Sequence, residues 1–391
     1  MKHRSPFSVF RFPFTVLPAL LAALLFAGCS SPEKQEVDSG SIIIGHVTDS
    51  HSWHIADYYT SDGEEHSIAI NLPVILLDDG SLQVFSSKRF HHGHEVYQGK
   101  KHTYALVGGG LVKEEVVCVE PTDDAENAVL TTHDGQHYAA LLDDEGNSVK
   151  PLDFSVTKTS AAIIIAVVLL SVIIIFSAKK YKVRQGKAPH GMQSLVELLV
   201  LHVRDDIVGP ILGHNTNRFL PYLLTLFFFI FFCNILGLIP FFPAGVNITG
   251  NIAVTAILAL ITFFITNLNG NHHYWKDIFW TPGVPSWLKI FPLMPIVELV
   301  GVFTKPIVLM IRLFANMTAG HIVILGFVVI IFILSNSLGM AVGGTVSVVS
   351  VIFAVFISLL ECLVAYIQAF VFTMLSALYF SMAVEEPQEA H

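Results

Sequence analysis

The segment Pro306–His321 reads PIVLMIRLFANMTAGH and lies within the apolar run Ile296–Leu334, which decides the fold. A second apolar run, Thr345–Val384, follows after a turn that contains three glycines (residues 339–344). At about 1.5 Å per residue, each run forms a helix of about 60 Å, roughly twice the ~30 Å hydrocarbon core of a bilayer. The two runs therefore predict a hairpin of long helices that lie strongly oblique in a membrane.

The composition agrees with a membrane protein. Of 391 residues, 53% are hydrophobic and only 14% are charged, whereas soluble domains carry about 25% charged residues. A wholly soluble or disordered chain is thereby excluded. The net charge of −9 is uneven, because residues 30–158 hold 22 acidic and 8 basic side chains and the remainder has a net charge of +5. This balance does not favour nucleic-acid binding.

Arg312 is an unusual residue for such a helix. It is followed by 48 residues without Asp, Glu, Lys or Arg before Glu361. A charge at a helix centre costs roughly 2.5–3.5 kcal/mol on insertion scales, and Arg cannot lose its proton to avoid this cost. At about 100° per residue, three further polar residues share its helix face: Glu298, Lys305 and Asn316. Lys305 is interpreted as a structural cation that extends its amine towards water.

The register of the hairpin brings polar residues of the two helices together. Facing residues of an antiparallel hairpin have a constant sum of residue numbers; Arg312 with Gln368 gives 680, and His321 with Glu361 gives 682. Half of either sum falls in the glycine turn. The sequence therefore predicts two polar layers, with a titratable pair towards the outside and a fixed cation midway. Histidine and carboxyl groups can both pass protons, so this layout favours a proton path interrupted by a positive barrier.

Three shorter spans and one surface helix precede the hairpin. The predicted spans are Thr159–Ala178, Phe219–Ile239 and Asn251–Asn269, which makes about five spans in all. Met192–Leu212 has mixed polarity and is predicted as an amphipathic helix at the interface. Directly after the first span come five bases without an acid, which place that end in the cytoplasm: Lys179, Lys180, Lys182, Arg184 and Lys187.

The chain divides into four predicted regions. Residues 1–29 have a basic start, an apolar centre and small residues before Cys29, which is typical of an export signal, with Cys29 as the candidate cysteine of a lipoprotein-type signal. Cleavage elsewhere or an uncleaved anchor are the alternatives. Residues 30–158 alternate short apolar runs with turn signals and are predicted as a β-rich periplasmic domain. Residues 159–384 form the membrane domain, and residues 385–391 form a cytoplasmic tail.

The exported region is rich in histidine. Its histidines could bind a metal or buffer protons, but loop histidines are more often solvated, so we expect no metal site and no cofactor. The histidines considered are His51, His54, His91, His92, His94 and His102. The four cysteines show no metal-binding spacing and imply no disulfide framework. No nucleotide-binding motif is present.

Three motifs resemble those of a known family. Pro306–His321 resembles the signature of subunit a of the F-type ATP synthase membrane sector. Asn234–Pro240 (NILGLIP) resembles its second-span motif, and Gln368–Phe372 (QAFVF) resembles its last-helix motif. Gly237 stands where some relatives carry an acid. The resemblance covers roughly residues 155–385.

The resemblance assigns roles to six residues. It implies that Arg312 is the essential arginine facing the carboxylates of the rotating c-ring, with Gln368 as its neighbour and Asn316 beside the ring. His321 and Glu361 would form the outer half-channel. Glu298 would lie near the inner half-channel.

The expected function is that of a proton-translocating stator subunit, non-catalytic on its own, in a bacterial inner membrane. The partners implied by the resemblance are c-ring subunits, peripheral-stalk b subunits and the rest of the ATP synthase. A sodium-translocating version of the same subunit is one alternative. A stand-alone ion channel or secondary transporter is another, although transporters usually show repeated halves, which this chain lacks.

Overall fold

The computed structural model describes most of the chain from residue 48 to residue 385. The described ranges are 48–59, 65–78, 80–93, 95–108, 114–123, 128–132, 135–143, 146–183, 186–239, 245–279, 293–338 and 340–385. The predicted signal at residues 1–29 lies outside them, as does most of the predicted tail. The described residues divide into two compact units: one holds residues 48–321 and 361–385, and the other holds residues 322–360.

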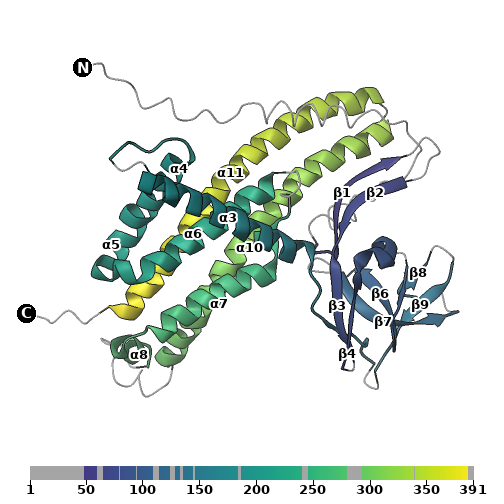
Figure 1. Cartoon of the computed structure of the whole chain (residues 1–391), viewed down its shortest axis with the longest axis horizontal. Helices are drawn as coiled ribbons and strands as arrows, with labels where there is room; N and C mark the ends of the chain where they lie inside the picture. The colour runs from purple at the N-terminus through teal and green to yellow at the C-terminus, as the bar shows by residue number, and fades with distance from the viewer. Residues whose placement is uncertain are drawn as a thin grey trace, which may run out of the picture. The chain divides into compact units, whose positions relative to one another are not determined.

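The region between residues 52 and 153 is built from antiparallel strands, which confirms its predicted β-rich character (Figure 1). A two-stranded ribbon joins β1 (Ser52–Tyr59) and β2 (Glu65–Asn71). A three-stranded sheet has the order β10-β3-β4, and a five-stranded sheet has the order β5-β6-β7-β9-β8. Their bounds are β3 Pro73–Asp78, β4 Ser81–Ser86, β5 Tyr97–Gln98, β6 Thr103–Gly108, β7 Glu114–Thr122, β8 Leu130–Thr131, β9 His137–Ala140 and β10 Leu152–Asp153.

One apolar core lies between the two larger sheets. Strand β3 buries alternate residues, Val74 and Leu76, which are fully inaccessible to solvent. They pack with residues of β6 and β7, among them Tyr104 and Cys118. The alternation follows from the two-residue period of a strand with one buried face.

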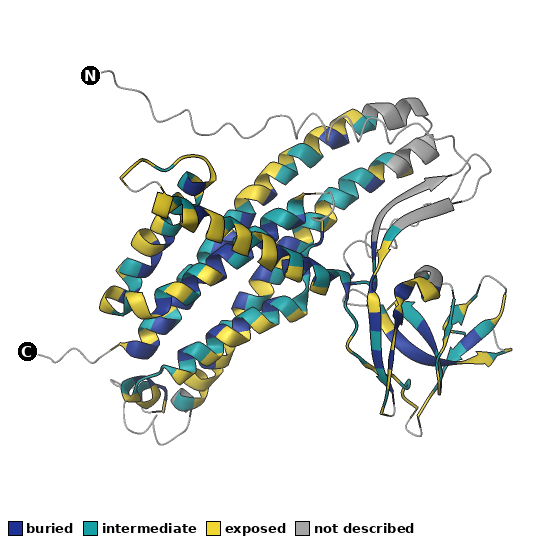
Figure 2. Cartoon of the chain, viewed as in Figure 1, coloured by how far each residue is buried: buried dark blue, intermediate teal, exposed yellow. Residues whose placement is uncertain are grey.

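The rest of the chain is helical. The longer helices are α3 (Lys158–Val183), α6 (Thr216–Leu238), α7 (Ile252–Leu268), α10 (Leu293–Leu338) and α11 (Met340–Val384). Shorter elements are α4 (Met192–Leu201), a π-helix η3 (His202–Val208), α5 (Gly209–Leu212), the 3-10 turns η2 (Ser87–Gly93), η4 (Gly213–Asn215) and η5 (Ile248–Gly250), and α8 (His272–Phe279). Figure 2 shows exposed, intermediate and buried residues interspersed along the long helices.

Four of the described helical segments are long and apolar enough to cross a membrane. They are Lys158–Val183, Met192–Leu238, Pro295–Ile331 and Val346–Val384. The pair α7 and α8, bent by 102°, makes a fifth if it is counted as one span. The prediction of about five spans is therefore confirmed as four to five candidates.

The structure changes two details of the predicted helices. Residues 343 and 344 lie inside α11, so of the three predicted turn glycines only Gly339, which is outside the described residues, falls between α10 and α11. Glycine lowers helix stability by only about 1 kcal/mol, and the apolar residues around it continue the helical pattern.

The second detail concerns the predicted surface helix Met192–Leu212. It comprises α4, η3 and α5, and it joins α6 through η4.

The helices share one large core. Residues of α6, α10 and α11 with almost no solvent exposure meet there, including Phe227, Leu313 and Phe372. At the start of α3, the Asp49 carboxylate accepts a hydrogen bond of 3.1 Å from the Thr159 amide. This contact satisfies one of the amides that a helix start leaves without an intrahelical acceptor.

Candidate functional site

Helix α10 buries one face and exposes the opposite one. Leu309, Leu313 and Met317, spaced four residues apart, are at most 3% exposed and belong to the helical core. Arg312 and Asn316 lie on the exposed face. The neighbouring exposed residues are apolar: Ile307, Val308 and Ile311. Arg312 makes no hydrogen bond or ion pair with any residue that the structure describes.

Asn316 and Gln368 connect α10 to α11. The Asn316 side-chain amide donates to Gln368 Oε1 over 2.9 Å. Gln368 is only 3% exposed, and its Nε2 has no acceptor among the described residues. The sequence register places Gln368 opposite Arg312. In the structure, Gln368 bonds instead to Asn316, which lies one turn further along α10. Tyr379 of α11 lies within electrostatic range of the Arg312 guanidinium, and the sequence analysis gave this tyrosine no role.

Glu361 of α11 packs directly over Gly320 of α10. A Cβ atom added to Gly320 would overlap the Glu361 carboxylate. Glu361 is 9% exposed, and neither of its carboxylate oxygens has a hydrogen-bond partner among the described residues. The missing side chain of Gly320 therefore creates the space in which an unpartnered buried carboxyl group lies.

His321 lies next to Gly320 but turns towards backbone carbonyls. Its Nδ1 is 3.0 Å from the Met317 carbonyl oxygen, and its Nε2 is 3.2 Å from that of Gly237. A neutral imidazole can donate to only one of these oxygens, whereas a doubly protonated ring can donate to both. The ring is therefore held by two acceptors between α10 and α6.

His321 and Glu361 occupy adjacent levels of the hairpin without bonding to each other. The contact of Glu361 with Gly320 gives a register sum of 681, between the predicted sums of 680 and 682. Among the described residues, however, no ion pair within 4.0 Å joins His321 to Glu361. The structure thus places Glu361 against Gly320, one residue from His321, and the imidazole bonds to backbone carbonyls instead.

A buried polar network beside this level was not predicted from the sequence. Asn234 of α6 and Thr249 of η5 are fully buried. The Thr249 hydroxyl donates to Asn234 Oδ1 over 2.6 Å, and the Asn234 amide donates to the Ala365 carbonyl over 3.2 Å. Asn247 donates to the Met317 carbonyl, which also faces His321. A buried Asn within an apolar span is a signal that could have identified the network, since such groups need hydrogen-bond partners.

Near the start of α10, Lys305 borders a small cavity. Its amine lies 5.3 Å from the centre of the Tyr379 ring, over its face. Other polar residues line the cavity: Thr262, Thr266, Asn267 and Tyr274. Glu298 is exposed on α10 and lies within electrostatic range of Lys305.

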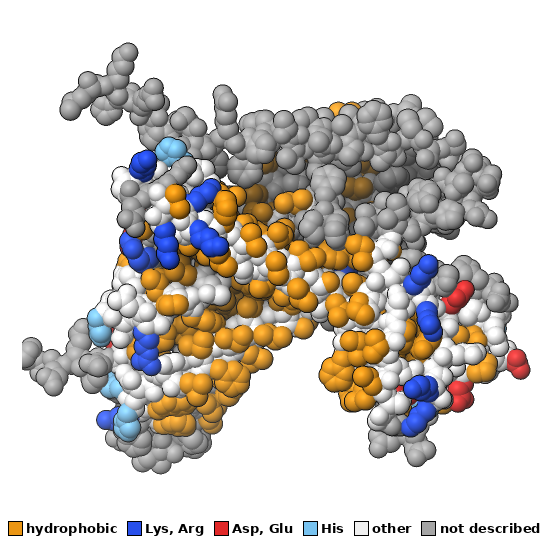
Figure 3. Space-filling model, in the orientation of Figure 1, with side chains coloured by type: hydrophobic (Ala, Val, Ile, Leu, Met, Phe, Trp, Pro, Cys, Tyr) orange, Lys and Arg blue, Asp and Glu red, His pale blue; other side chains and the backbone are white. Residues whose placement is uncertain are grey.

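Basic side chains are concentrated at one end of the helical part. Figure 3 shows hydrophobic side chains over most of the visible helical surface and Lys and Arg side chains concentrated at one end. This distribution is typical of membrane proteins, whose basic residues collect at one interface.

The family model for the ATP synthase A chain matches residues 160–381, which include all the site residues described above. The chain belongs to this family. It is a multi-pass membrane protein. Membership of the family supports the role of a stator subunit in the membrane sector, associated with the rest of the ATP synthase complex.

Relatives from several bacteria agree with the family model. The chain is 42% identical to ATP synthase subunit a of Chloroherpeton thalassium over 61% of this chain and 70% of the relative. It is 44% identical to ATP synthase subunit a 2 of Chlorobaculum tepidum, over 60% and 65% respectively. For ATP synthase subunit a of Myxococcus xanthus, the identity is 40%, over 65% and 79%.

The N-terminal region matches a different model. Residues 42–154 match a domain of unknown function (DUF8433). This match covers the strand-rich region and carries no functional assignment.

Proposed function

We propose that this chain translocates protons as the stator subunit of a bacterial F-type ATP synthase, and that Arg312 faces the carboxylates of a rotating c-ring. One observation carries the proposal: the Arg312 side chain is exposed and has no acidic partner among the described residues. On a helix face surrounded by lipid, such a charge costs roughly 2.5–3.5 kcal/mol. A carboxylate of another subunit would remove this cost, because guanidinium groups bind carboxylates in a two-point geometry.

Arg312 would act both as the binding partner of an ionised ring carboxylate and as a barrier to protons. A ring carboxylate arriving opposite the guanidinium is stabilised when it is ionised, so it releases its proton to one half-channel. The fixed positive charge repels protons and prevents direct leakage between the two half-channels. A potential of 100 mV supplies about 2.3 kcal/mol per elementary charge moved across the membrane, which drives the ring in one direction.

Glu361 and His321 would form the outer half-channel. Both Glu361 oxygens lack hydrogen bonds from the described residues, so their lone pairs are available to a water molecule or a migrating proton. His321 can change its protonation state while one ring nitrogen stays bonded to the carbonyl of Met317 or Gly237. Gly237 supplies only a carbonyl at the level where some relatives carry an acid.

The inner half-channel would pass Glu298 and the cavity beside Lys305. The hydroxyls and the amide that line this cavity can hydrogen-bond water. Asn316 and Gln368, bonded to each other near Arg312, would orient the arriving ring carboxylate. Neither residue is charged, so neither competes with it for the guanidinium.

The domain organisation and the orientation belong to the same proposal. Residues 1–29 would direct export, residues 30–158 would lie in the periplasm, residues 159–384 in the inner membrane, and residues 385–391 in the cytoplasm. The bases at the end of α3 support this orientation, since Lys and Arg collect on the cytoplasmic side. Peripheral-stalk b subunits would hold the chain stationary against the ring.

ATP-driven transport by membrane vesicles tests the transported ion. We expect inverted vesicles that contain the complex to acidify on addition of ATP in sodium-free buffer, and sodium to leave the initial rate unchanged. ATP-driven sodium uptake that a protonophore stimulates, without acidification of the vesicle lumen, would replace the proton proposal with its sodium alternative. Transport by the chain alone, without c-ring subunits and without ATP, would support a stand-alone channel or transporter and would contradict the stator proposal.

A further inference from the structure

Three potential metal ligands converge in the β-rich region, in a part of the chain that the proposed ion path does not use. Asp78 is the last residue of β3, His102 directly precedes β6, and Cys118 lies in β7. Strand β3 belongs to the three-stranded sheet, whereas β6 and β7 belong to the five-stranded sheet. We call these three residues the Asp-His-Cys cluster.

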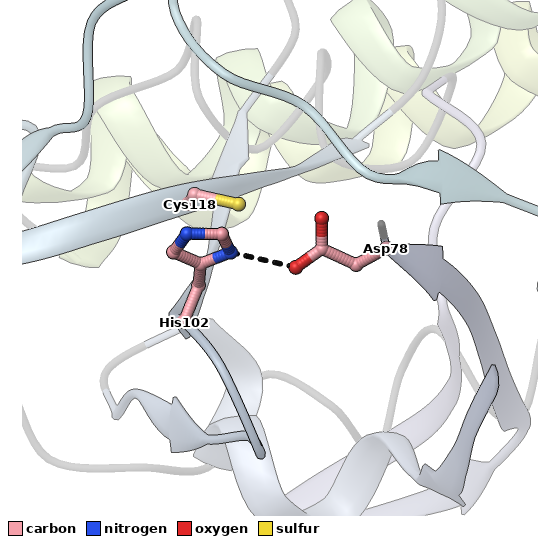
Figure 4. Close-up of side chains that lie close together, drawn as sticks. All are labelled: Asp78, His102 and Cys118. Atoms are coloured by element: carbon pink, nitrogen blue, oxygen red, sulfur yellow. Dashed lines mark hydrogen bonds and ion pairs between the residues drawn. The ribbon is translucent and has the colours of Figure 1, made fainter. Parts of the chain in front are cut away.

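The ligand atoms of the Asp-His-Cys cluster lie close together. One atom from each residue lies within 4.8 Å of the other two, and His102 Nδ1 is 2.7 Å from Asp78 Oδ2. Figure 4 shows the Cys118 sulfur and the Asp78 carboxylate near the same nitrogen of the imidazole ring. In a Cys–His–Asp catalytic relay, the sulfur and the carboxylate would instead contact opposite ring nitrogens. The arrangement is therefore one of three donors that face a common point.

The burial of the cluster is that of a closed site with one open edge. Cys118 is fully buried, and the Asp78 side chain is 7% exposed. The His102 side chain is 30% exposed, which leaves an edge through which an ion can enter. A fully buried sulfur cannot attack a large substrate, so its surroundings suit coordination and not nucleophilic catalysis.

A second layer of hydrogen bonds fixes the carboxylate. The hydroxyl of Tyr104, itself fully buried, donates to Asp78 Oδ2 over 2.8 Å, and the Gln83 amide donates to the Tyr104 oxygen over 3.0 Å. Such supporting hydrogen bonds orient metal ligands in known sites.

We propose that the Asp-His-Cys cluster binds one Zn²⁺ ion, with water as the fourth ligand. Oxygen, imidazole nitrogen and thiolate sulfur are the ligands that zinc takes, at about 2.0–2.3 Å and in tetrahedral geometry. These bonds separate neighbouring ligand atoms by about 3.3–3.8 Å. The carboxylate and the imidazole must therefore move apart by roughly 1 Å, which small side-chain rotations can supply, and the Cys118 thiol releases its proton on binding.

The ion would cross-link the two sheets around their common core. Val74, Leu76, Tyr104 and Cys118 pack in that core, and the ligands come from both sheets. Among the described residues of this region, no disulfide joins the two sheets.

Cobalt binding to the full-length chain in detergent tests the proposal, because Co²⁺ replaces Zn²⁺ and reports its ligands by absorption. After chelator treatment, we expect one Co²⁺ per chain, with a thiolate-to-cobalt charge-transfer band and the intense visible bands of tetrahedral Co²⁺. Zn²⁺ should bleach both bands. Cys118→Ser should remove the charge-transfer band, whereas Cys233→Ser, which changes another buried cysteine in α6, should keep it.

A second measurement, of thermal stability, tests the proposal independently of whether Cys118→Ser folds well. Zn²⁺ should raise the melting temperature of the wild-type chain by several degrees and leave that of His102→Gln unchanged, while affinity for Co²⁺ falls at least about tenfold in this variant. Absence of stoichiometric Co²⁺ binding, or a charge-transfer band that persists in Cys118→Ser, would overturn the proposal. Binding without any thiolate band would do the same, since it would place the ion on other residues.

Discussion

Replacement of Arg312 by Ala is expected to abolish proton-coupled ATP synthesis while the soluble catalytic head of the complex still hydrolyses ATP. The guanidinium is exposed on α10 and is not neutralised by any described residue of the chain. In the proposed mechanism, its removal takes away both the partner for an ionised ring carboxylate and the positive barrier between the half-channels. The measurements are ATP synthesis driven by an imposed proton gradient and ATP-driven acidification of inverted vesicles.

Two matched variants separate this role from loss of charge or of stability. Arg312→Lys keeps a cation but loses the two-point geometry, so we expect severely impaired synthesis in a fully assembled complex. Arg218→Ala removes an arginine whose partner is Asn269, outside the proposed path, and should keep most of the activity. Normal ATP-driven proton pumping by Arg312→Ala would refute the assignment.

Substitution of Gly320 by Ala is expected to reduce proton pumping by about tenfold to a hundredfold, as misplacement of a reacting group by about 1 Å can do. The added methyl group would overlap the Glu361 carboxylate, so the carboxyl group must leave its position at the level of His321. The rate of ATP-driven acidification, normalised to the amount of assembled complex, measures the effect.

Two further variants serve as a control and as a rescue for Gly320→Ala. Gly301→Ala adds a methyl group to the same helix at a position where no described residue of this chain lies within 4 Å, and it should pump at the wild-type rate. Gly320→Ala combined with Glu361→Asp shortens the displaced side chain by one methylene and should recover part of the lost rate. Equal pumping by Gly320→Ala and Gly301→Ala would show that the position of Glu361 does not matter.

The sequence predicted the elements of the hairpin because apolar runs and rare polar residues carry strong periodic signals. The register sums of 680 and 682 placed Glu361 at the level of residues 319 to 321, and the packing of Glu361 on Gly320 agrees with this placement. The strand-rich N-terminal region was likewise predicted from alternation and turn residues. Glycines 343 and 344 misled the prediction of the turn, since surrounding apolar residues keep them in α11.

Contacts made by backbone atoms or across distant segments could not be predicted. His321 bonds to the carbonyls of Met317 and Gly237, and carbonyls are present at every residue, so they leave no sequence signal. The predicted histidine group also separates: buried His51 lies beside Asp153 and Glu114, whereas His102 bonds to Asp78. The side chains of His54, His91, His92 and His94 lie outside the described residues.

The Asp-His-Cys cluster could not be predicted from the sequence for a similar reason. Its members are 24 and 16 residues apart and come from two sheets, so no local spacing identifies them. The expectation of no metal site rested on the usual solvation of loop histidines and on the spacing of the cysteines. Only the pairing of the strands brings a carboxylate, an imidazole and a thiol to one point.

Cysteine cross-linking tests most directly whether the Arg312 face of α10 lies against the ring. Ala319 is exposed and is two helical turns from Arg312 on the same face. In a chain that carries Cys362→Ser, which removes the exposed native cysteine of α11, Ala319→Cys should form a disulfide with a cysteine placed one turn from the ring carboxylate. Ile257→Cys, on the exposed face of α7, should not. Equal cross-linking at both positions, or none at Ala319→Cys in an assembled complex, would contradict the account.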